Sequence, residues 1–269
     1  MMIRSLWTGA TGMQAMQFHI DSIANDLANV NTNGYKKKHV NFQDLLYQTV
    51  RASGVQGGED VNMPVGIQVG HGVVVAGTTP IMRMGALVET TGQYDMALQE
   101  PQGLPVRTFF RVNLPNGEFA YTRDGTFRRT VDGYLATTDG LLLNEDIRIN
   151  EEALSVTISA SGMVSQRLPG EREDQEVGQI NVYTFSNPAG LTSVGGNRFM
   201  ETPSSGEATE SIPGQDGAAT IKQGLLETSN TDAITEMVNM IAAQRAYEFN
   251  SRSIQTSDEM LQTINTLKR

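Results

Sequence analysis

The sequence predicts an α+β protein whose long N- and C-terminal helices pair as a coiled coil and flank a central all-β domain. Three observations support this: apolar residues at heptad spacing near both ends, regularly spaced Gly-containing turn dipeptides in the middle, and a glycine-rich segment between the two patterns. We expect three parts within the 269 residues: residues 1–46 with 225–269 as a terminal helical domain, 47–77 as an extended connector or hairpin, and 78–224 as the β domain.

The first predicted helix covers residues 3–30. Its apolar residues follow a three-four alternation, interrupted only at Gln17, which is the heptad seam of a coiled coil: Ile3, Leu6, Ala10, Met13, Ile20, Ala24 and Leu27. A second row, formed by Met16, Ile23 and Val30, widens the stripe, so the helix is expected to touch more than one neighbour. The pattern stops at residues 31–34, where Asn and Gly tolerate the left-handed conformation that closes a helix.

The second predicted helix follows Ser229–Asp232 and runs to the end without Gly or Pro. Apolar residues recur every seven positions or flank that row on the same broad face: Met240, Tyr247, Ile254 and Leu261, with Ile234, Met237, Ile241 and Ile264. At 1.5 Å per residue such a helix is about 55 Å long. A seam of that length needs partners, and we expect the N-terminal helix of the same chain and the helices of neighbouring subunits to cover it.

The middle of the chain changes to a strand pattern. Turn dipeptides occur at residues 116–117, 124–125, 132–133 and 139–140, with short apolar runs between them, which predicts an antiparallel meander. Further strands are predicted where Leu154, Val156 and Ile158 alternate, and over residues 179–185. Residues 52–77 contain seven glycines and are expected to form an extended connector or a long hairpin.

Charge and composition exclude several classes of function. The formal net charge is −10, which repels phosphate backbones, so nucleic acid is not an expected partner. The absence of cysteine excludes disulfides, thiol nucleophiles and most structural zinc sites. No stretch approaches the roughly 18 apolar residues of a membrane span, and the start lacks the apolar core and cleavage site of a signal peptide, so export would keep the N-terminus.

No pattern of catalytic residues is evident. The three histidines, at positions 19, 39 and 71, have no zinc-ligand spacing, and residues 70–75 begin like a dinucleotide loop but lack its last glycine. The cations Lys36, Lys37 and Lys38 are interpreted as exposed charges near the negative end of the first helix. We therefore predict no catalytic residue, no cofactor, no metal and no small-molecule substrate.

The residues around the heptads carry a more specific signal. Residues 24–36 read ANDLANVNTNGYK and resemble the A-N-N-L-A-N-x-x-T-x-G-[FY]-[KR] signature of the flagellar rod and hook axial family, with Asp26 in place of the usual second Asn. Residues 236–241, 244–248 and 258–261 resemble the C-terminal helix of that family, and residues 121–127 match its Y-T-R-D-G-[ST]-F motif. The runs at 3–7, 42–49 and 64–73 are similar to the distal rod branch of the family. Residues 96–110 depart from the family pattern, because Pro101 and Pro105 indicate an altered edge or loop.

This resemblance implies a structural subunit of the bacterial flagellum that self-assembles into a helical tube and transmits torque from motor to hook. It implies a basal-body location in the rod that crosses the periplasm, type III export without a cleaved signal, and contacts with copies of itself, with proximal rod and hook proteins and with periplasmic and outer-membrane ring proteins. The expected assembly interface comprises Ile3, Leu6, Met13, Ile20, Ile23, Leu27, Asn25, Asn29, Met240, Ile241, Tyr247, Ile254, Leu261 and Ile264. Other axial proteins of the proximal rod or hook, a cell-wall-acting enzyme, and a secreted adhesin are the alternatives.

Overall fold

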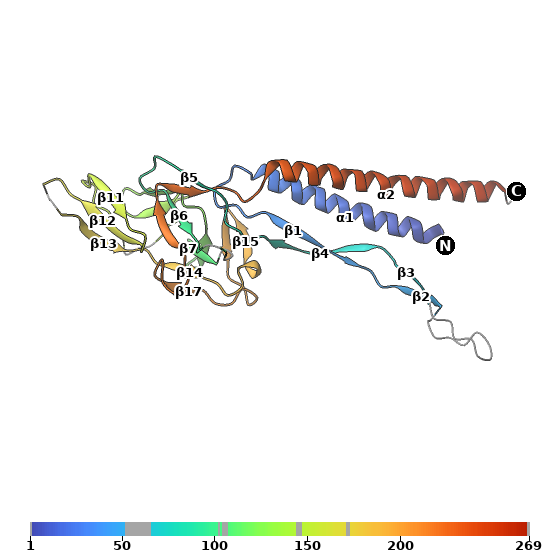
Figure 1. The fold of residues 1–269 in the computed structure, drawn as a ribbon, viewed down its shortest axis with the longest axis horizontal. Coiled ribbons are helices and arrows are strands. Elements are labelled where there is room, and N and C mark those ends of the chain that lie inside the picture. Colours follow the sequence, from blue (N-terminus) through green and yellow to red (C-terminus); the bar gives the residue numbers. More distant parts are fainter. Residues whose placement is uncertain are drawn as a thin grey trace. The chain divides into compact units, whose positions relative to one another are not determined.

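The computed structural model describes residues 2–51, 66–101, 103, 107–143, 147–170 and 173–267. Its contacts divide the chain into two compact units. Residues 1–27, 38–79 and 233–269 form the first, here called the helical unit, and residues 28–37 and 80–232 form the second, here called the β unit. Figure 1 shows the two long helices and the strands. The predicted α+β class is therefore confirmed.

The helical unit contains α1 (Met2–Ala28) and α2 (Ala233–Leu267). The helices run antiparallel and in contact, since Ser5 near the start of α1 lies beside Ser257 near the end of α2, with 3.0 Å between their hydroxyl oxygens. Further along, Gly9 faces Ile254 and Gly12 faces Asn250. α1 ends two residues before the predicted boundary, and the turn that follows contains Gly34 with φ +68°.

A two-stranded ribbon completes the helical unit. β1 (Lys38–Asp44) pairs with β4 (Val73–Pro80), and beyond them β2 (Gln48–Arg51) pairs antiparallel with β3 (Ile67–Val69). The ribbon packs on α1, because the rings of His19 and Phe42 lie 5.6 Å apart and a Cβ on Gly72 would lie 2.1 Å from the Thr11 hydroxyl oxygen. Residues 52–65 of the expected connector lie outside the described residues, and a connector role for 47–77 stays a prediction.

The β unit is built around a six-stranded sheet in the order β15-β16-β8-β7-β14-β17. These strands are β15 (Thr192–Gly195), β16 (Arg198–Met200), β8 (Phe119–Thr122), β7 (Thr108–Asn113), β14 (Val182–Thr184) and β17 (Thr209–Ser211). A three-stranded sheet contains β11 (Ser155–Ile158), β12 (Met163–Arg167) and β13 (Gln175–Gln179). Three strand pairs complete the unit: β9 (Phe127–Arg129) with β10 (Leu135–Thr137), β6 (Met96–Gln99) with β18 (Thr220–Gln223), and β5 (Leu87–Glu89) with β19 (Leu225–Glu227). A short 3-10 helix, η1, covers Pro188–Gly190.

Two apolar clusters form the core of the β unit. The larger includes Leu98, Phe110 and Val164, and unites the paired strands with the three-stranded sheet. The smaller is aromatic and packs Phe109 edge-on against Phe185 and Phe199, with ring centroids 5.7 and 5.9 Å apart. The β unit thus has a core of its own.

Two of the predicted turns lie between paired strands, and the turn at 139–140 lies between Ala136 and Leu142, which form an antiparallel bridge. The single meander is wrong at residues 124–125. Gly117 (φ +82°) joins the paired β7 and β8, and Gly133 (φ +91°) joins the paired β9 and β10. By contrast, β8 pairs with β16 and β9 with β10, so Asp124 and Gly125 connect strands that do not pair with each other. The reason is a close backbone contact, in which the amide of Met96 donates to the carbonyl of Gly125 at 3.0 Å. The dipeptide that suggested a hairpin serves this contact instead.

The strand predicted over 179–185 is also divided. β13 ends at Gln179 and β14 begins at Val182, with the buried Ile180 between them. The predicted strand at 154–158 forms as β11, where Val156 and Ile158 point into the core while Leu154 is exposed. Alternation therefore located the strand correctly, but it did not show where the chain leaves one sheet for another.

We predict that Gly125→Ala destabilises the β unit by about 1–3 kcal/mol, because a Cβ at this position would lie 1.6 Å from the Met96 carbonyl oxygen and force the two segments apart. Chemical denaturation followed by near-UV circular dichroism measures the change. Gly77→Ala is the matched control, because a Cβ there meets no atom within 4 Å. Equal stability of the two variants would refute the close contact.

Candidate functional site

The predicted assembly residues of α1 lie at several levels of burial. Ile23 is buried, whereas Leu6, Met13, Ile20 and Leu27 are half-buried. Asn25 is exposed and Asn29 is half-buried, and the side chain of Ile3 lies outside the described part of the chain. The seam of α1 is therefore only partly covered within one chain.

The predicted residues of α2 separate into two groups. Met240, Ile254 and Leu261 are half-buried, on the face that carries the buried Ala243 and Ser257. Ile241, Tyr247 and Ile264 are more exposed, with 58%, 38% and 45% of their surface open. A broad apolar stripe on α2 thus extends well beyond the part that α1 covers.

Small residues set the contact between the two helices, and the heptad analysis missed them. A Cβ on Gly9 would lie 2.8 Å from Cγ1 of Ile254, and a Cβ on Gly12 would lie 2.9 Å from the Asn250 amide nitrogen. The helix backbones approach closely only because these positions carry no side chain. A search for small residues at i, i+3 spacing on the seam would have found the contact.

Asp26 explains one departure from the family signature. Its side chain is buried at the end of α1, and both carboxylate oxygens lie 3.3 Å from the backbone nitrogen of Lys38, which donates to them. The position needs a hydrogen-bond acceptor, which a carboxylate and an amide oxygen both supply. Replacement of the usual Asn by Asp therefore keeps this contact.

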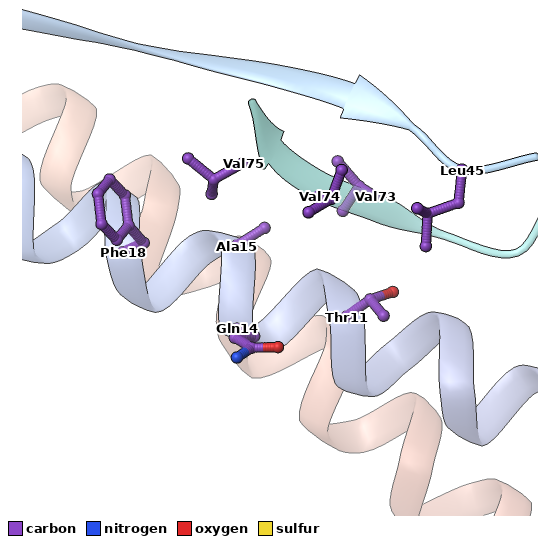
Figure 2. A pocket seen from close by; sticks show the side chains of 8 residues that line it. All are labelled: Thr11, Gln14, Ala15, Phe18, Leu45, Val73, Val74 and Val75. Carbon is purple, nitrogen blue, oxygen red and sulfur yellow. The ribbon is translucent and has the colours of Figure 1, made fainter. Parts of the chain in front are cut away.

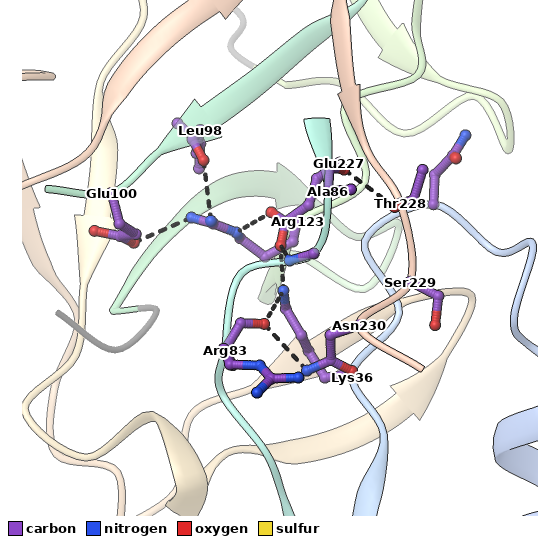
Figure 3. Close-up of polar contacts among 12 residues, drawn as sticks. Lys36, Arg83, Ala86, Leu98, Glu100, Arg123, Glu227, Thr228, Ser229 and Asn230 are labelled. Atoms are coloured by element: carbon purple, nitrogen blue, oxygen red, sulfur yellow. Dashed lines mark hydrogen bonds and ion pairs between the residues drawn. The ribbon is translucent and has the colours of Figure 1, made fainter. Parts of the chain in front are cut away.

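A buried ion cluster lies within the β unit (Figure 3). The guanidinium of Arg123 donates through Nε to Oε2 of Glu227 at 2.9 Å and through Nη1 to Oε1 of Glu100 at 3.1 Å. It also donates to the backbone carbonyls of Thr108 (2.7 Å) and Leu98 (3.1 Å). The side chains of Arg123 and Glu227 are fully buried. Through these directed bonds, Arg123 links β6, β7 and β19.

Lys36 supplies the second cation of the cluster. Its ammonium group pairs with Oε1 of Glu227 and donates to the carbonyl of Arg83 at 3.0 Å, and its side chain is fully buried. The prediction that all three lysines at 36–38 are exposed is therefore wrong for Lys36, whereas Lys38 is exposed. Sequence alone did not distinguish them, because the partner of Lys36 lies 191 residues away.

Burial and pairing shift the titration of these groups. Burial lowers the pKa of Lys36 to about 8, against the opposing field of Glu227. Burial alone would raise the pKa of Glu227, but the nearby Arg123 and Lys36 outweigh it and hold that pKa below its usual value. Because folded Lys36 releases its proton at a lower pH than the unfolded chain, its contribution to stability rises with pH between about 8 and 10.5.

The cluster joins the two segments through which the chain enters and leaves the β unit. Lys36 belongs to residues 28–37, and Glu227 closes β19 shortly before residue 232. The amide of Gly34 donates to the Glu227 carbonyl at 2.8 Å, and that of Lys37 donates to the Asn230 side chain at 2.8 Å. A Cβ on Gly34 would lie 2.7 Å from the Arg123 backbone, so the glycine of the signature is required here.

Among the described residues, no group of three or more His, Asp or Glu side chains could hold a metal ion. The ring Nδ1 of His71 lies 2.9 Å from the Leu46 carbonyl, and His19 packs on Phe42. In the part of the chain that the structure describes, no helix is long and apolar enough to cross a membrane.

An antiparallel pair of terminal helices with exposed apolar residues, together with a β unit whose entry and exit segments are held by buried charges, characterises this chain. Two family models match parts of it. Residues 222–267 match the family described as "Flagellar basal body rod FlgEFG protein C-terminal", and residues 106–166 match "Flagellar hook protein FlgE/F/G D1 domain".

Full-length relatives give the family. The chain is 45% identical to the flagellar basal-body rod protein FlgG of Borreliella burgdorferi over 100% of both chains, and 42% identical to that of Caulobacter vibrioides over 99% of this chain and 100% of the relative. Identity to the FlgG protein of Bacillus subtilis is 38% over 100% of both chains. The chain belongs to the FlgG family of flagellar basal-body rod proteins. The Helicobacter pylori hook protein FlgE2 matches 71% of this chain and 43% of its own at 15% identity, with a TM-score of 0.24.

We predict that Gly9→Val separates α1 from α2, because the added side chain would overlap Ile254. The helical content and thermal stability of the helical unit should fall, as measured by far-UV circular dichroism and by hydrogen exchange at residues 250–257. Gly77→Val is the control, since a Cβ at that position meets open space. Unchanged exchange protection in Gly9→Val would contradict the close helix contact.

We predict that Glu227→Gln costs about 3–5 kcal/mol of unfolding free energy at pH 7, because it leaves Arg123 and Lys36 buried without a full countercharge. The pKa of Glu227 is lower in the folded protein than the unfolded value of 4.5, so the unfolded chain binds more protons as the pH falls. The stability due to Glu227 is therefore present above about pH 4.5 and is lost below it.

The measurement is a series of denaturant titrations of the β unit from pH 7 to pH 3. The wild-type protein and an exposed control, Glu207→Gln, should lose stability along the same curve. Glu227→Gln should start lower and fall less steeply. A parallel fall in all three proteins would show that Glu227 is not responsible.

Proposed function

We propose that this protein is a structural subunit of the flagellar distal rod, which self-assembles into a helical tube and transmits torque from motor to hook. The single observation that carries the proposal is the apolar surface that one chain leaves exposed on its terminal helices, in a chain of the FlgG family. Ile234, Val238 and Ile241 on α2 are 76%, 61% and 58% exposed, and Trp7 on α1 is 68% exposed. Such residues favour contact with another protein surface over contact with water.

Repetition of the contact explains a tube. When one surface of a subunit binds a different surface of an identical copy, the assembly closes into a ring only if the rotation between copies closes. Otherwise it continues to grow as a helix. The terminal helices carry the apolar stripe, and helices of this kind gain most of their stability from packing. We infer that α1 and α2 pair as a coiled coil and that copies of the same chain cover the remaining stripe, with the fourteen predicted residues at this interface.

The three-part division provides the layers of such a tube. Residues 1–46 with 225–269 would contain its helical wall, residues 47–77 would connect, and residues 78–224 would form the outer β domain, with residues 28–37 and 225–232 as the segments that enter and leave the β unit. Torque must pass through each subunit, and the buried charges at Lys36, Arg123 and Glu227 resist separation of the entry and exit segments of the β unit. A stiff subunit suits a component of a rotating rod.

The partners follow from the place in the flagellum. We infer contacts with further copies, with proximal rod and hook proteins, and with ring proteins of the periplasm and outer membrane, after export that leaves the N-terminus uncleaved. We also infer a purely structural role with no enzymatic activity, because the polar groups of the buried cluster are engaged with one another and with backbone carbonyls.

We predict that removing residues 1–27 or residues 233–269 abolishes polymerisation while the β unit stays folded. Both deletions leave residues 28–37 and 80–232 in place, and with them the ion cluster and both apolar clusters. Electron microscopy of the concentrated full-length protein should show straight tubes, and neither deletion variant should form them. Near-UV circular dichroism checks that the aromatic cluster of the β unit persists. Tubes from both deletion variants would refute the proposed function.

A further inference from the structure

The outward face of α2 changes character along its length. At 3.6 residues per turn, Ile234, Met237, Val238 and Ile241 lie on the side opposite Asn250, Ile254 and Ser257, which contact α1. All four are exposed, with Met237 at 51%. The same outward row then continues as Arg245, Glu248, Arg252, Gln255 and Glu259, all exposed. On this outward row the apolar residues are confined to the first turns, here called the α2 patch (residues 234, 237, 238 and 241), whereas the exposed apolar residues further along α2, among them Phe249 and Ile264, lie off the row. The patch therefore marks a local contact surface.

A groove of matching character lies on α1, on the side away from α2 (Figure 2). It encloses a cavity of about 270 Å³ and is lined on α1 by Thr11, Gln14, Ala15 and Phe18. Its other wall is Leu45 and the valines at 73–75 of β4. None of these lining residues is charged. Phe18 on the α1 side and Val74 on the ribbon are 45% and 44% exposed, so the groove presents apolar surface to an occupant.

The groove and the α2 patch have the same length along a helix. Thr11 and Phe18 are seven residues apart, as are Ile234 and Ile241, which corresponds to about 10.5 Å in each helix. An antiparallel register that sets Phe18 opposite Ile234 therefore sets Thr11 opposite Ile241. The antiparallel direction is the one that α1 and α2 already adopt within a chain.

The same register brings complementary charges together. One heptad further along the two helices, this register sets Arg4 opposite Glu248. It also sets the exposed Trp7 opposite Arg245, a pair that can form a cation-π contact. Arg4 donates to the side chain of Gln48 and keeps further N–H donors for a carboxylate. Glu248 pairs with Arg245 at 2.9 Å in an exposed contact, which is weak enough to be exchanged.

We propose that the groove between α1 and β4 receives the α2 patch of a second copy of this chain, with Phe18 opposite Ile234 and Arg4 opposite Glu248. The occupant is another copy because α2 of the same chain lies against the opposite side of α1, where Ser5, Gly9 and Gly12 contact it. The contact joins two different surfaces, so each copy offers a free groove to the next and growth continues. This inference rests on the proposed self-assembly and specifies which surfaces meet.

Cysteine cross-linking tests the register, because the natural chain contains no cysteine. Full-length Phe18→Cys and Ile234→Cys proteins are mixed, polymerised and oxidised. We expect a disulfide-linked dimer that contains one copy of each variant. Phe18→Cys mixed with Gln255→Cys is the matched control, since Gln255 is exposed on the same face of α2 but lies 21 residues, or about 31 Å, further along. This control should give at least tenfold less dimer.

A second pair of variants tests the surface without cysteine. Val238→Glu places a charge in the α2 patch and should prevent tube formation, whereas Gln255→Glu adds the same charge to the outward face beyond it and should leave tubes intact. Helical content of both monomers should equal that of the wild type. Glu248→Arg should slow polymerisation, and Arg4→Glu with Glu248→Arg should restore it.

The outcomes separate the two proposals. If the unaltered chain forms no tubes, the proposed function fails and this inference fails with it. If tubes form but the 18–234 pair yields no more dimer than the 18–255 pair, or if Val238→Glu polymerises normally, only the docking of the α2 patch in the groove is overturned. A disulfide formed within a single chain, detected as a cross-linked monomer in the Phe18→Cys/Ile234→Cys double variant at high dilution, would also overturn it.

Discussion

The carboxylate of Glu227 shared between Arg123 and Lys36 is the constraint on which the β unit depends. Three fully buried charged side chains are costly to remove from water, and the cost is met only because each one has directed partners. Glu100 balances the second positive charge, and backbone carbonyls take the remaining donors of Arg123. A cluster of this kind tolerates few alternative arrangements, and this accounts for a unique pairing of segments nearly two hundred residues apart.

This constraint gives a physical meaning to the sequence signatures of the family. Gly34 and Lys36 close the N-terminal signature, and Arg123 lies in the central motif at 121–127. Read separately, they look like a helix end with exposed cations and a hairpin turn. In the fold they are one structure, because Gly34 leaves room for the backbone of Arg123 and Lys36 reaches the carboxylate that Arg123 also binds. The motifs are thus spaced along the chain but act at one place.

The helical unit follows the opposite logic, since it leaves apolar surface open. α1 and α2 approach closely through glycines, so they bury little of the broad stripe that the heptads supply. A stable monomer would cover that stripe or replace it with charge, as α2 does on its outward row alone after residue 241. An assembling subunit needs the surface exposed until another copy arrives. The rigid, charge-bonded β unit and the open helical unit therefore suit the two demands of a rod, which are stiffness within a subunit and adhesion between subunits.

Local patterns were sufficient for the elements whose physics is local. Heptad spacing located both helices to within a few residues, alternation located β11, and the Asn-Gly and Asp-Gly dipeptides marked the turns at 117 and 133. The signatures at both ends indicated the family, because a match of residue types at many positions can be recognised without knowing which residues are in contact. The close approach of α1 and α2 at Gly9 and Gly12 was missed, because the heptad pattern reads apolar side chains and a glycine contributes none.

By itself, the sequence determined that this is an α+β chain with a helix at each end that carries an apolar stripe, and that it contains no recognisable catalytic motif. Only the tertiary structure decided that Lys36 is buried while Lys38 is exposed, that residues 124–125 connect two sheets, and that one side of α1 is closed by α2 while the other borders a groove. The reason is that burial of a charge or a glycine depends on which distant segment arrives beside it, and periodicity along the chain carries no record of that partner.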